Sequence, residues 1–220
     1  MPPARFVDLS HAVEHGVVTY RGLPAPVICD YLSREQSRSH YAAGTEFQIG
    51  RIEMVGNTGT YLDSPFHRFA GAKDLSELPL RSLAELPGVV VDLPEGARAL
   101  DANLLRGVEV GGRAVLLRTA WSRHYGSERY FEGHPYVTRA AAELLVRAGA
   151  ALVGIDSLNI DDTADLERPA HTLLLGAEIP IVEHLTNLAG LGSERFRFSA
   201  VPARVRGFGT FPVRAFARLD

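Results

Sequence analysis

The sequence predicts a single α/β or α+β domain built on a mixed β-sheet. Short apolar runs of strand length recur along the chain, and only a few helical patterns lie between them. No internal repeat, low-complexity tract or polar linker divides the chain, and 220 residues are enough for one large domain with a substantial core. We therefore expect one domain over residues 1–220.

The predicted strands are short segments rich in β-branched and other apolar residues, bounded by Gly, Pro or polar residues. They are residues 6–10, 45–55, 88–93, 114–119, 151–155, 179–183, 196–202 and 211–217. In residues 45–55 the apolar alternation changes phase at Gly50 and Arg51, which predicts a β-bulge there.

Three helices are expected from their capping residues. Asp101 caps a short helix that runs through Arg106. Thr138 is the predicted N-cap of residues 139–148, where apolar residues follow helical spacing and Gly149 ends the helix. Pro169 opens a third helix over residues 169–175, which Gly176 ends.

Residues 17–44 are rich in proline and glycine and contain a polar run at residues 33–40. This composition predicts a loop or hairpin arm that lies over another surface. The segment is too long for a simple connection inside a compact domain. We therefore predict a homo-oligomer, either a dimer or a tetramer.

Composition and charge exclude several classes of function. The net charge of −3 and the lack of a basic block argue against binding to nucleic acid or to an anionic membrane. No apolar run is long enough to span a bilayer, and the N-terminus lacks the layout of a secretion signal. The single cysteine, Cys29, cannot form an internal disulfide. We expect a cytoplasmic protein.

The polar residues of greatest interest follow the strand predicted at residues 45–55. They read Asn57-Thr-Gly-Thr-Tyr-Leu-Asp-Ser-Pro-Phe-His67, and a second polar patch downstream contains His171 and Glu183. Imidazole and carboxylate groups of this kind bind a divalent cation and activate water. The residues alone leave purely structural roles open: Asp63 suits an Asx turn, and His67 suits an exposed loop.

The motif resembles that of the bacterial cyclase-like hydrolase family, which includes kynurenine formamidase, isatin hydrolase and certain dienelactone hydrolases. The signature of that family is His-Thr-Gly-Thr-His-x-Asp-x-Pro-x-His, and nine of the eleven positions from Asn57 to His67 fit it, wildcards included. Asp8-Leu9-Ser10 resembles the opening strand of the family, and Pro169-Ala-His171 with Glu183 resembles its second pair of ligands.

The resemblance implies a fold, a small-molecule substrate and a set of roles. The fold is a single-domain swivelling β/α/β fold with a mixed, barrel-like sheet. Asp63, His171 and Glu183 are the expected metal ligands. His67 is the expected general base, a role that suits a group titrating near neutral pH.

The motif departs from the family signature at Asn57 and Tyr61, where the family has histidines. One alternative is that a single divalent metal, Mn²⁺ or Zn²⁺, remains on Asp63, His171 and Glu183. Asn57 and Tyr61 would then be weak ligands or hydrogen-bond partners of the ligands. The other alternative is that no metal binds and that Asn57 and Tyr61 hydrogen-bond the carboxylates directly.

Two functional hypotheses follow. The first is a hydrolase that opens an amide, lactam or lactone bond of a small cyclic or aromatic metabolite, with His67 as general base. The second is a metal-free relative that binds a small molecule or partner without hydrolysis. A metal-free enzyme that uses Asp63 and His67 for acid–base chemistry lies between them. The sequence contains no Gly-x-Ser-x-Gly elbow, P-loop or dinucleotide fingerprint, and it assigns no substrate-binding residue.

Overall fold

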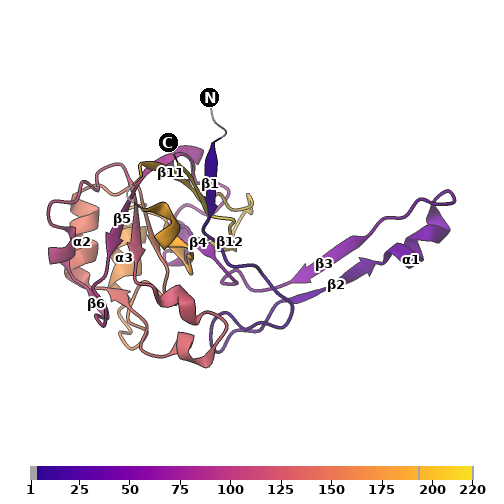
Figure 1. The fold of residues 1–220 in the computed structure, drawn as a ribbon, viewed down its shortest axis with the longest axis horizontal. Coiled ribbons are helices and arrows are strands. Elements are labelled where there is room, and N and C mark those ends of the chain that lie inside the picture. Colours follow the sequence, from indigo (N-terminus) through magenta and orange to yellow (C-terminus); the bar gives the residue numbers. More distant parts are fainter. Residues whose placement is uncertain (1–3, 193, 220) are drawn as a thin grey trace.

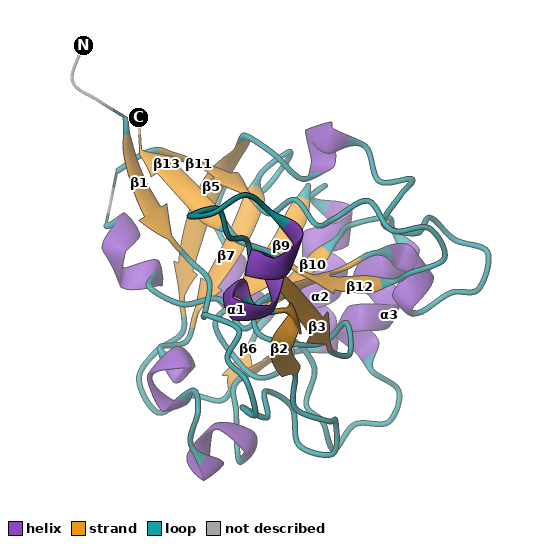
Figure 2. Cartoon of the chain, turned by 90° about the vertical axis from the view of Figure 1, so that its right-hand side faces the viewer, coloured by secondary structure: helices purple, strands orange, loops and turns teal. Residues whose placement is uncertain are grey.

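The computed structural model describes residues 4–192 and 194–219, and its centre is a nine-stranded mixed sheet (Figure 1). The strand order is β1-β13-β11-β5-β7-β9-β10-β4-β12. The four central strands β5, β7, β9 and β10 are parallel, and the flanking strands are antiparallel. The sheet curls into a half-barrel, so the predicted α/β fold with a mixed, barrel-like sheet is confirmed (Figure 2).

The strands of this sheet are short. They are β1 (Arg5–Asp8), β4 (Tyr61–Asp63), β5 (Leu86–Asp92), β7 (Ala114–Arg118), β9 (Leu152–Ile155), β10 (Ile181–Glu183), β11 (Phe196–Ser199), β12 (Thr210–Pro212) and β13 (Phe216–Leu219). Two small sheets pair β2 (Val27–Leu32) with β3 (Ile49–Glu53) and β6 (Ala99–Leu100) with β8 (Tyr136–Val137). The α-helices are α1 (Arg34–Ser37), α2 (Arg139–Arg147) and α3 (Pro169–Gly176).

The parallel strands form the most buried part of the sheet, because apolar residues cover both of its faces. Helices α2 and α3 pack on one face around a cluster that includes Val115, Leu145 and Leu174. A second cluster, which includes Leu116 and Phe198, fills the other face. None of the helices in residues 4–192 and 194–219 has the length and apolar character needed to cross a bilayer.

The register around β4 determines which polar side chains meet. Strand β4 pairs with β10 on one side and β12 on the other, so that Tyr61 lies opposite Glu183 and Asp63 lies opposite Thr210. Directly opposed residues in an antiparallel pair project on the same face. The register therefore brings four polar groups together on β4, β10 and β12: the carboxylates of Asp63 and Glu183, the Tyr61 phenol and the Thr210 hydroxyl.

The backbone beside β12 approaches the motif closely at Gly209. Its carbonyl accepts hydrogen bonds from the N–H and the hydroxyl of Ser64. A Cβ atom at Gly209 would lie 2.7 Å from the backbone N and Cα of His67. A glycine is required here because any larger residue would displace the loop that carries His67.

Most of the expected elements are present, including the helix caps at Asp101 and Thr138. Two expectations are wrong. Residues 211–217 do not form one strand, because β12 pairs with β4 while β13 pairs with β1 and β11. The bulge is not at Gly50 and Arg51: the register shifts between Asp30 and Leu32 on the partner strand, so the extra residue lies in β2.

The segment before the motif forms a hairpin arm, as its composition predicts. Strands β2 and β3 and helix α1 extend away from the body of the domain (Figure 1). Large apolar side chains remain exposed on this arm: Val27, Tyr31, Tyr41, Phe47, Ile49 and Ile52. The arm therefore has an apolar surface that the rest of the described chain does not cover.

Candidate metal and active site

Asp63 is the carboxylate at the centre of the site. It is fully buried, and its Oδ1 accepts a 2.5 Å hydrogen bond from the Thr210 hydroxyl. Its Oδ2 is buried and has no hydrogen-bond partner among the described residues. Burial by itself raises the pKa of Asp63, but the proximity of His171, the charge of His67 and the Thr210 hydroxyl hold that pKa below its ordinary value. A buried charged oxygen without a partner is costly, so Oδ2 is an available ligand for a cation or a donor.

His171 lies in the first turn of α3 and is held by Asp161. One carboxylate accepts hydrogen bonds from the backbone N–H groups of Ala170 and His171 and from the His171 ring at Nδ1, at 2.6, 3.0 and 2.7 Å. Because Nδ1 donates to Asp161, the Nε2 atom faces the site. Burial lowers the pKa of His171, but the carboxylates of Asp161, Asp63 and Glu183 outweigh it and raise that pKa to about 10.

Glu183 is the second buried carboxylate, at the end of β10. The backbone N–H of Ile160 donates to its Oε1 at 2.6 Å, and the Tyr61 hydroxyl donates to its Oε2 at 2.5 Å. The Asn159 amide lies 3.5 Å from Oε2. Glu183 Oε1 also lies 3.7 Å from His171 Nε2. Oε1 accepts only one hydrogen bond, so its second lone pair leaves room for one further contact.

The protonation of the Tyr61–Glu183 pair follows from burial. Burial raises the pKa of Glu183 to about 7, with Asp63 acting in the same direction and His171 opposing it. Burial and the charges of both carboxylates raise the pKa of the Tyr61 hydroxyl well above its ordinary value. Asn57 lies within hydrogen-bonding reach of the Tyr61 side chain. Tyr61 is therefore a protonated donor to Glu183 in this structure.

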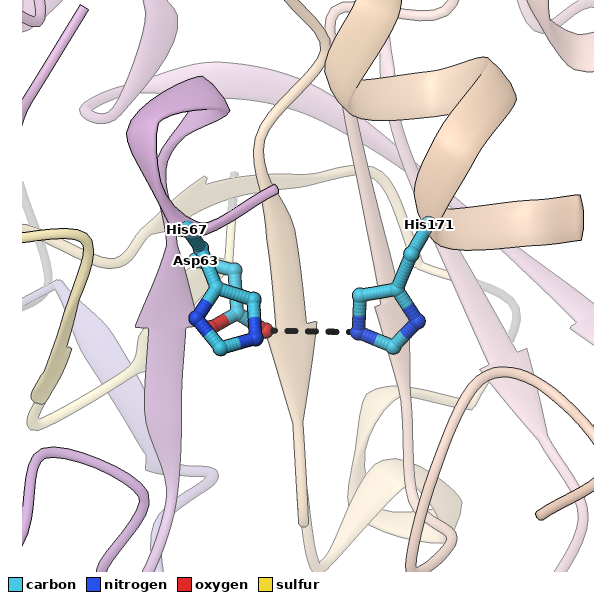
Figure 3. A group of neighbouring side chains, drawn as sticks. All are labelled: Asp63, His67 and His171. Carbon is cyan, nitrogen blue, oxygen red and sulfur yellow. Dashed lines mark ion pairs between the residues drawn. The ribbon is translucent and has the colours of Figure 1, made fainter. Parts of the chain in front are cut away.

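His67 lies on the short turn after Asp63 and is partly exposed. Its Nδ1 is 2.8 Å from the Thr210 hydroxyl, which can donate to Asp63 and accept from His67 at the same time. This pattern assigns the proton to Nδ1 and leaves the Nε2 lone pair free. Figure 3 shows the His67 ring in front of the Asp63 carboxylate, with the His171 ring facing both across a gap. The centroids of the two rings are 5.9 Å apart.

The spacing of these groups fits a divalent cation. Asp63, His67 and His171 each offer one ligand atom, and these atoms all lie within 4.8 Å of one another. Asp63 Oδ2 is 3.8 Å from His171 Nε2. Two ligands about 2.1 Å from one tetrahedral cation lie about 3.4 Å apart. A small contraction of the Asp63–His171 pair would therefore bring these two atoms to the spacing of metal ligands.

A cavity of about 280 Å³ opens above these groups. Its lining is mixed: most lining residues are polar or charged, and Tyr20 and Leu23 come from the loop before the arm. The lining residues are Tyr20, Leu23, Asn57, Tyr61, His67, Arg68, Asn159, Arg168, His171 and Glu183. The structure therefore brings together the six site residues predicted from the sequence: five line the cavity, and Asp63 lies 3.8 Å from two of them, His67 and His171.

Comparison with known proteins places the chain in a family. A family model described as a putative cyclase matches residues 7–162, which is more than half of the chain. The chain belongs to the Cyclase family. A kynurenine formamidase of Bacillus cereus is 28% identical over 99% of both chains, and one of Bacillus cytotoxicus is 27% identical over the same shares.

Solved structures related to this Cyclase-family chain share its fold. An isatin hydrolase bound to the product analogue thioisatinate has a TM-score of 0.83 at 21% identity, covering 98% of this chain and 92% of that one. A potential metal-dependent hydrolase with cyclase activity has a TM-score of 0.80 at 23% identity, with 98% of each chain covered. At these identities the likeness shows the fold and no more.

Sequence reasoning missed several residues of this Cyclase-family site. Asp161 is one of them: it is fully buried and holds His171. A signal was present, since the helix at Pro169 has no Ser, Thr, Asp or Asn immediately before it to act as a cap. Thr210 and Asn159 gave no such signal, because only the fold brings them to Asp63 and Glu183.

His184, next to Glu183, lies behind the site in a fully buried position. Its ring is 5.0 Å from that of Tyr61 and 5.5 Å from that of Tyr130, and neither ring nitrogen has a hydrogen-bond partner among the described residues. Burial lowers the pKa of His184 to about 3. The imidazole is therefore neutral at pH 7.

The low pKa of the buried His184 predicts a loss of stability in mild acid. Below about pH 6.5 the unfolded chain protonates this histidine while the folded chain does not, so the free energy of unfolding falls as pH decreases from 6.5 toward 3. One such group contributes up to about 1.4 kcal/mol per pH unit. His184→Asn, which suits the backbone φ of 58°, is expected to show a shallower pH dependence in urea unfolding between pH 7 and 5. Equal slopes for the two proteins would contradict the assignment.

Proposed function

We propose that the protein is a metal-dependent hydrolase that opens an amide, lactam or lactone bond of a small cyclic or aromatic compound. The observation that carries the proposal is the unpartnered, fully buried Oδ2 of Asp63 beside His171 Nε2. The kynurenine formamidase relatives support hydrolysis of an amide bond. The metal, Mn²⁺ or Zn²⁺, would be held by Asp63, His171 and Glu183.

The residues of the chain divide the chemistry between them. A bound metal would polarise the substrate carbonyl and lower the pKa of water. His67 accepts the proton of the attacking water at Nε2 and returns it to the leaving nitrogen or oxygen. Thr210 orients His67 through its Nδ1, and Asp161 orients His171 in the same way. Tyr61 and Asn57 act as hydrogen-bond partners of Glu183 and of each other rather than as ligands.

A metal-free binding protein is a second candidate, and a specific contact favours it. Tyr61 and the Ile160 N–H together occupy both oxygens of Glu183, and His171 lies close enough to compensate the carboxylate charge. In that case the cavity would bind a small molecule without cleaving a bond.

Metal analysis and turnover separate the two candidates. Protein purified without chelator is analysed for transition metals, then assayed with formamides, lactams and lactones in the presence of Mn²⁺ or Zn²⁺. The hydrolase proposal predicts about one metal per chain and turnover of at least one substrate class. Metal-free protein that neither binds metal on titration nor turns over any substrate supports the binding protein instead.

We also propose that the chain forms a homo-oligomer through the hairpin arm. Ile49 and Ile52 on β3 are 49% and 55% exposed, which is unfavourable for a surface that stays in water. Light scattering at micromolar concentration is expected to give a dimer or tetramer. The Ile49→Glu, Ile52→Glu variant is expected to be smaller, whereas Leu80→Glu on the body is not. A monomeric parent protein would refute the proposal.

A further inference from the structure

Arg168 is a cationic side chain of the cavity that has no anionic partner. Its guanidinium lines the cavity, where one nitrogen lies 3.4 Å from the amide oxygen of Asn159. It also lies within hydrogen-bonding reach of the Tyr20 hydroxyl. Among the described residues it forms no ion pair with a carboxylate. A guanidinium has five N–H donors, so most of them remain available to a ligand.

The lack of a partner is unusual because the loop before Arg168 is acidic. Each carboxylate of that loop has another partner. Asp161 binds His171, Asp162 faces Arg98 at 3.9 Å, Asp165 accepts from the backbone N–H of Glu167, and Glu167 pairs with Arg139 at 2.5 Å. The carboxylates of the loop therefore pair with other residues. The side chain of Arg168 pairs with none of them and lines the cavity.

The backbone of Arg168 is held in place. Arg168 has φ = 49°, a left-handed conformation that is uncommon for residues other than glycine and that often occurs at ligand sites. Its N–H donates to the Asp165 carbonyl, and its carbonyl accepts from Thr172 in the first turn of α3. Both sides of the residue are therefore held, and the side chain cannot turn away by a simple change of the backbone.

We propose that Arg168 is a specificity-determining residue that binds a carboxylate, or an equivalent anionic oxygen group, carried by the substrate. The proposal rests on the proposed function and narrows its substrate class to aromatic amides or lactams that bear such a group. Guanidinium groups bind carboxylates with two parallel hydrogen bonds, which gives both affinity and orientation. His67 and the proposed metal ligands would lie at the reacting bond, and Arg168 would contact the anionic group of the same compound from another part of the cavity lining.

A structural role is the competing explanation. Arg168 could serve only to hold Asn159, which in turn approaches Glu183. That contact is long, and the Asn159 oxygen already accepts a 3.0 Å hydrogen bond from the backbone N–H of Asp161. The contact with Asn159 therefore occupies one nitrogen of the guanidinium and leaves its other N–H donors available.

The test compares substrates that differ only in charge. KM and kcat are measured for uncharged formanilide and for 2-, 3- and 4-formamidobenzoate with the parent protein, Arg168→Gln, Arg168→Lys and Arg68→Gln. Arg147→Gln, an exposed arginine on α2, is the control for the change in net charge. Binding of the three aminobenzoates, which have no bond to hydrolyse, is measured in parallel by calorimetry.

The proposal predicts that Arg168→Gln raises KM for at least one formamidobenzoate by about 10- to 100-fold while formanilide changes less than about twofold. Arg168→Lys is expected to recover part of the loss, and Arg147→Gln is expected to match the parent. An equal loss for charged and uncharged substrates, or an effect confined to Arg68→Gln, overturns the proposal.

The binding measurement keeps this inference separate from the proposed function. If no amide is hydrolysed but an aminobenzoate binds the parent and not Arg168→Gln, the anion site stands and the hydrolase assignment fails. If amides are hydrolysed and aminobenzoate binding is unchanged in Arg168→Gln, the carboxylate is held elsewhere and the inference fails.

Discussion

The His67→Ala variant is expected to lose about 10²- to 10⁴-fold in kcat while it keeps its fold and its bound metal. Thr210 contacts Nδ1 of His67, which leaves the Nε2 atom available as a base. The side chain is 35% exposed, so its removal costs little packing. The measurements are kcat at saturating metal, metal content and urea unfolding.

The same variant separates two roles that the geometry allows for His67. Its imidazole lies close enough to Asp63 and His171 to be a third ligand, as well as a base. If it is a ligand, metal affinity falls together with activity; if it is the base, only activity falls. His40→Ala, which removes an exposed histidine on the arm, is the control. Unchanged kcat in His67→Ala would mean that the motif loop is structural.

The fold could be predicted where local sequence determines the structure. Strand β9 is buried and apolar throughout, β7 is buried and apolar up to its last residue, Arg118, and Thr138 caps α2 by accepting a hydrogen bond from the Ala141 N–H. The prediction of one strand over residues 211–217 was wrong, because a run of strand-forming residues does not show which strands each half of the run will pair with. Val213, between β12 and β13, bonds to the Thr60 carbonyl where the chain passes from one side of the sheet to the other.

The site divides in a similar way. Asp63 and His67 are four residues apart on one motif, so their proximity follows from spacing alone. The hydrogen bond between Tyr61 and Glu183 depends on the β4–β10 register, and the contact of Thr210 with Asp63 depends on β12. Arg168 could not be found from sequence, because its place in the cavity depends on which nearby carboxylates pair with other residues.

The double variant Asn57→His, Tyr61→His is expected to bind zinc about 10-fold or more tightly than the parent. Position 61 lies directly opposite Glu183 in the β4–β10 register, and Asn57 lines the same cavity. Imidazole nitrogen is a better zinc ligand than an amide oxygen or a protonated phenol. The change also removes the hydrogen bond by which Tyr61 occupies Glu183 Oε2. Calorimetric titration after chelator stripping measures the effect, with urea unfolding to confirm that the buried position tolerates histidine.

Tyr61→Phe separates the two causes of tighter binding. This variant frees Glu183 Oε2 but adds no nitrogen, and phenylalanine fills nearly the same buried volume. If zinc affinity rises equally in Tyr61→Phe and in the double variant, the Tyr61–Glu183 hydrogen bond is what limits metal binding. If it rises only in the double variant, the limit is the number of good ligands. Weaker zinc binding in both variants would instead show that the Tyr61 hydroxyl orients Glu183 for metal binding. In that case the Tyr61–Glu183 hydrogen bond supports the metal site rather than competing with it.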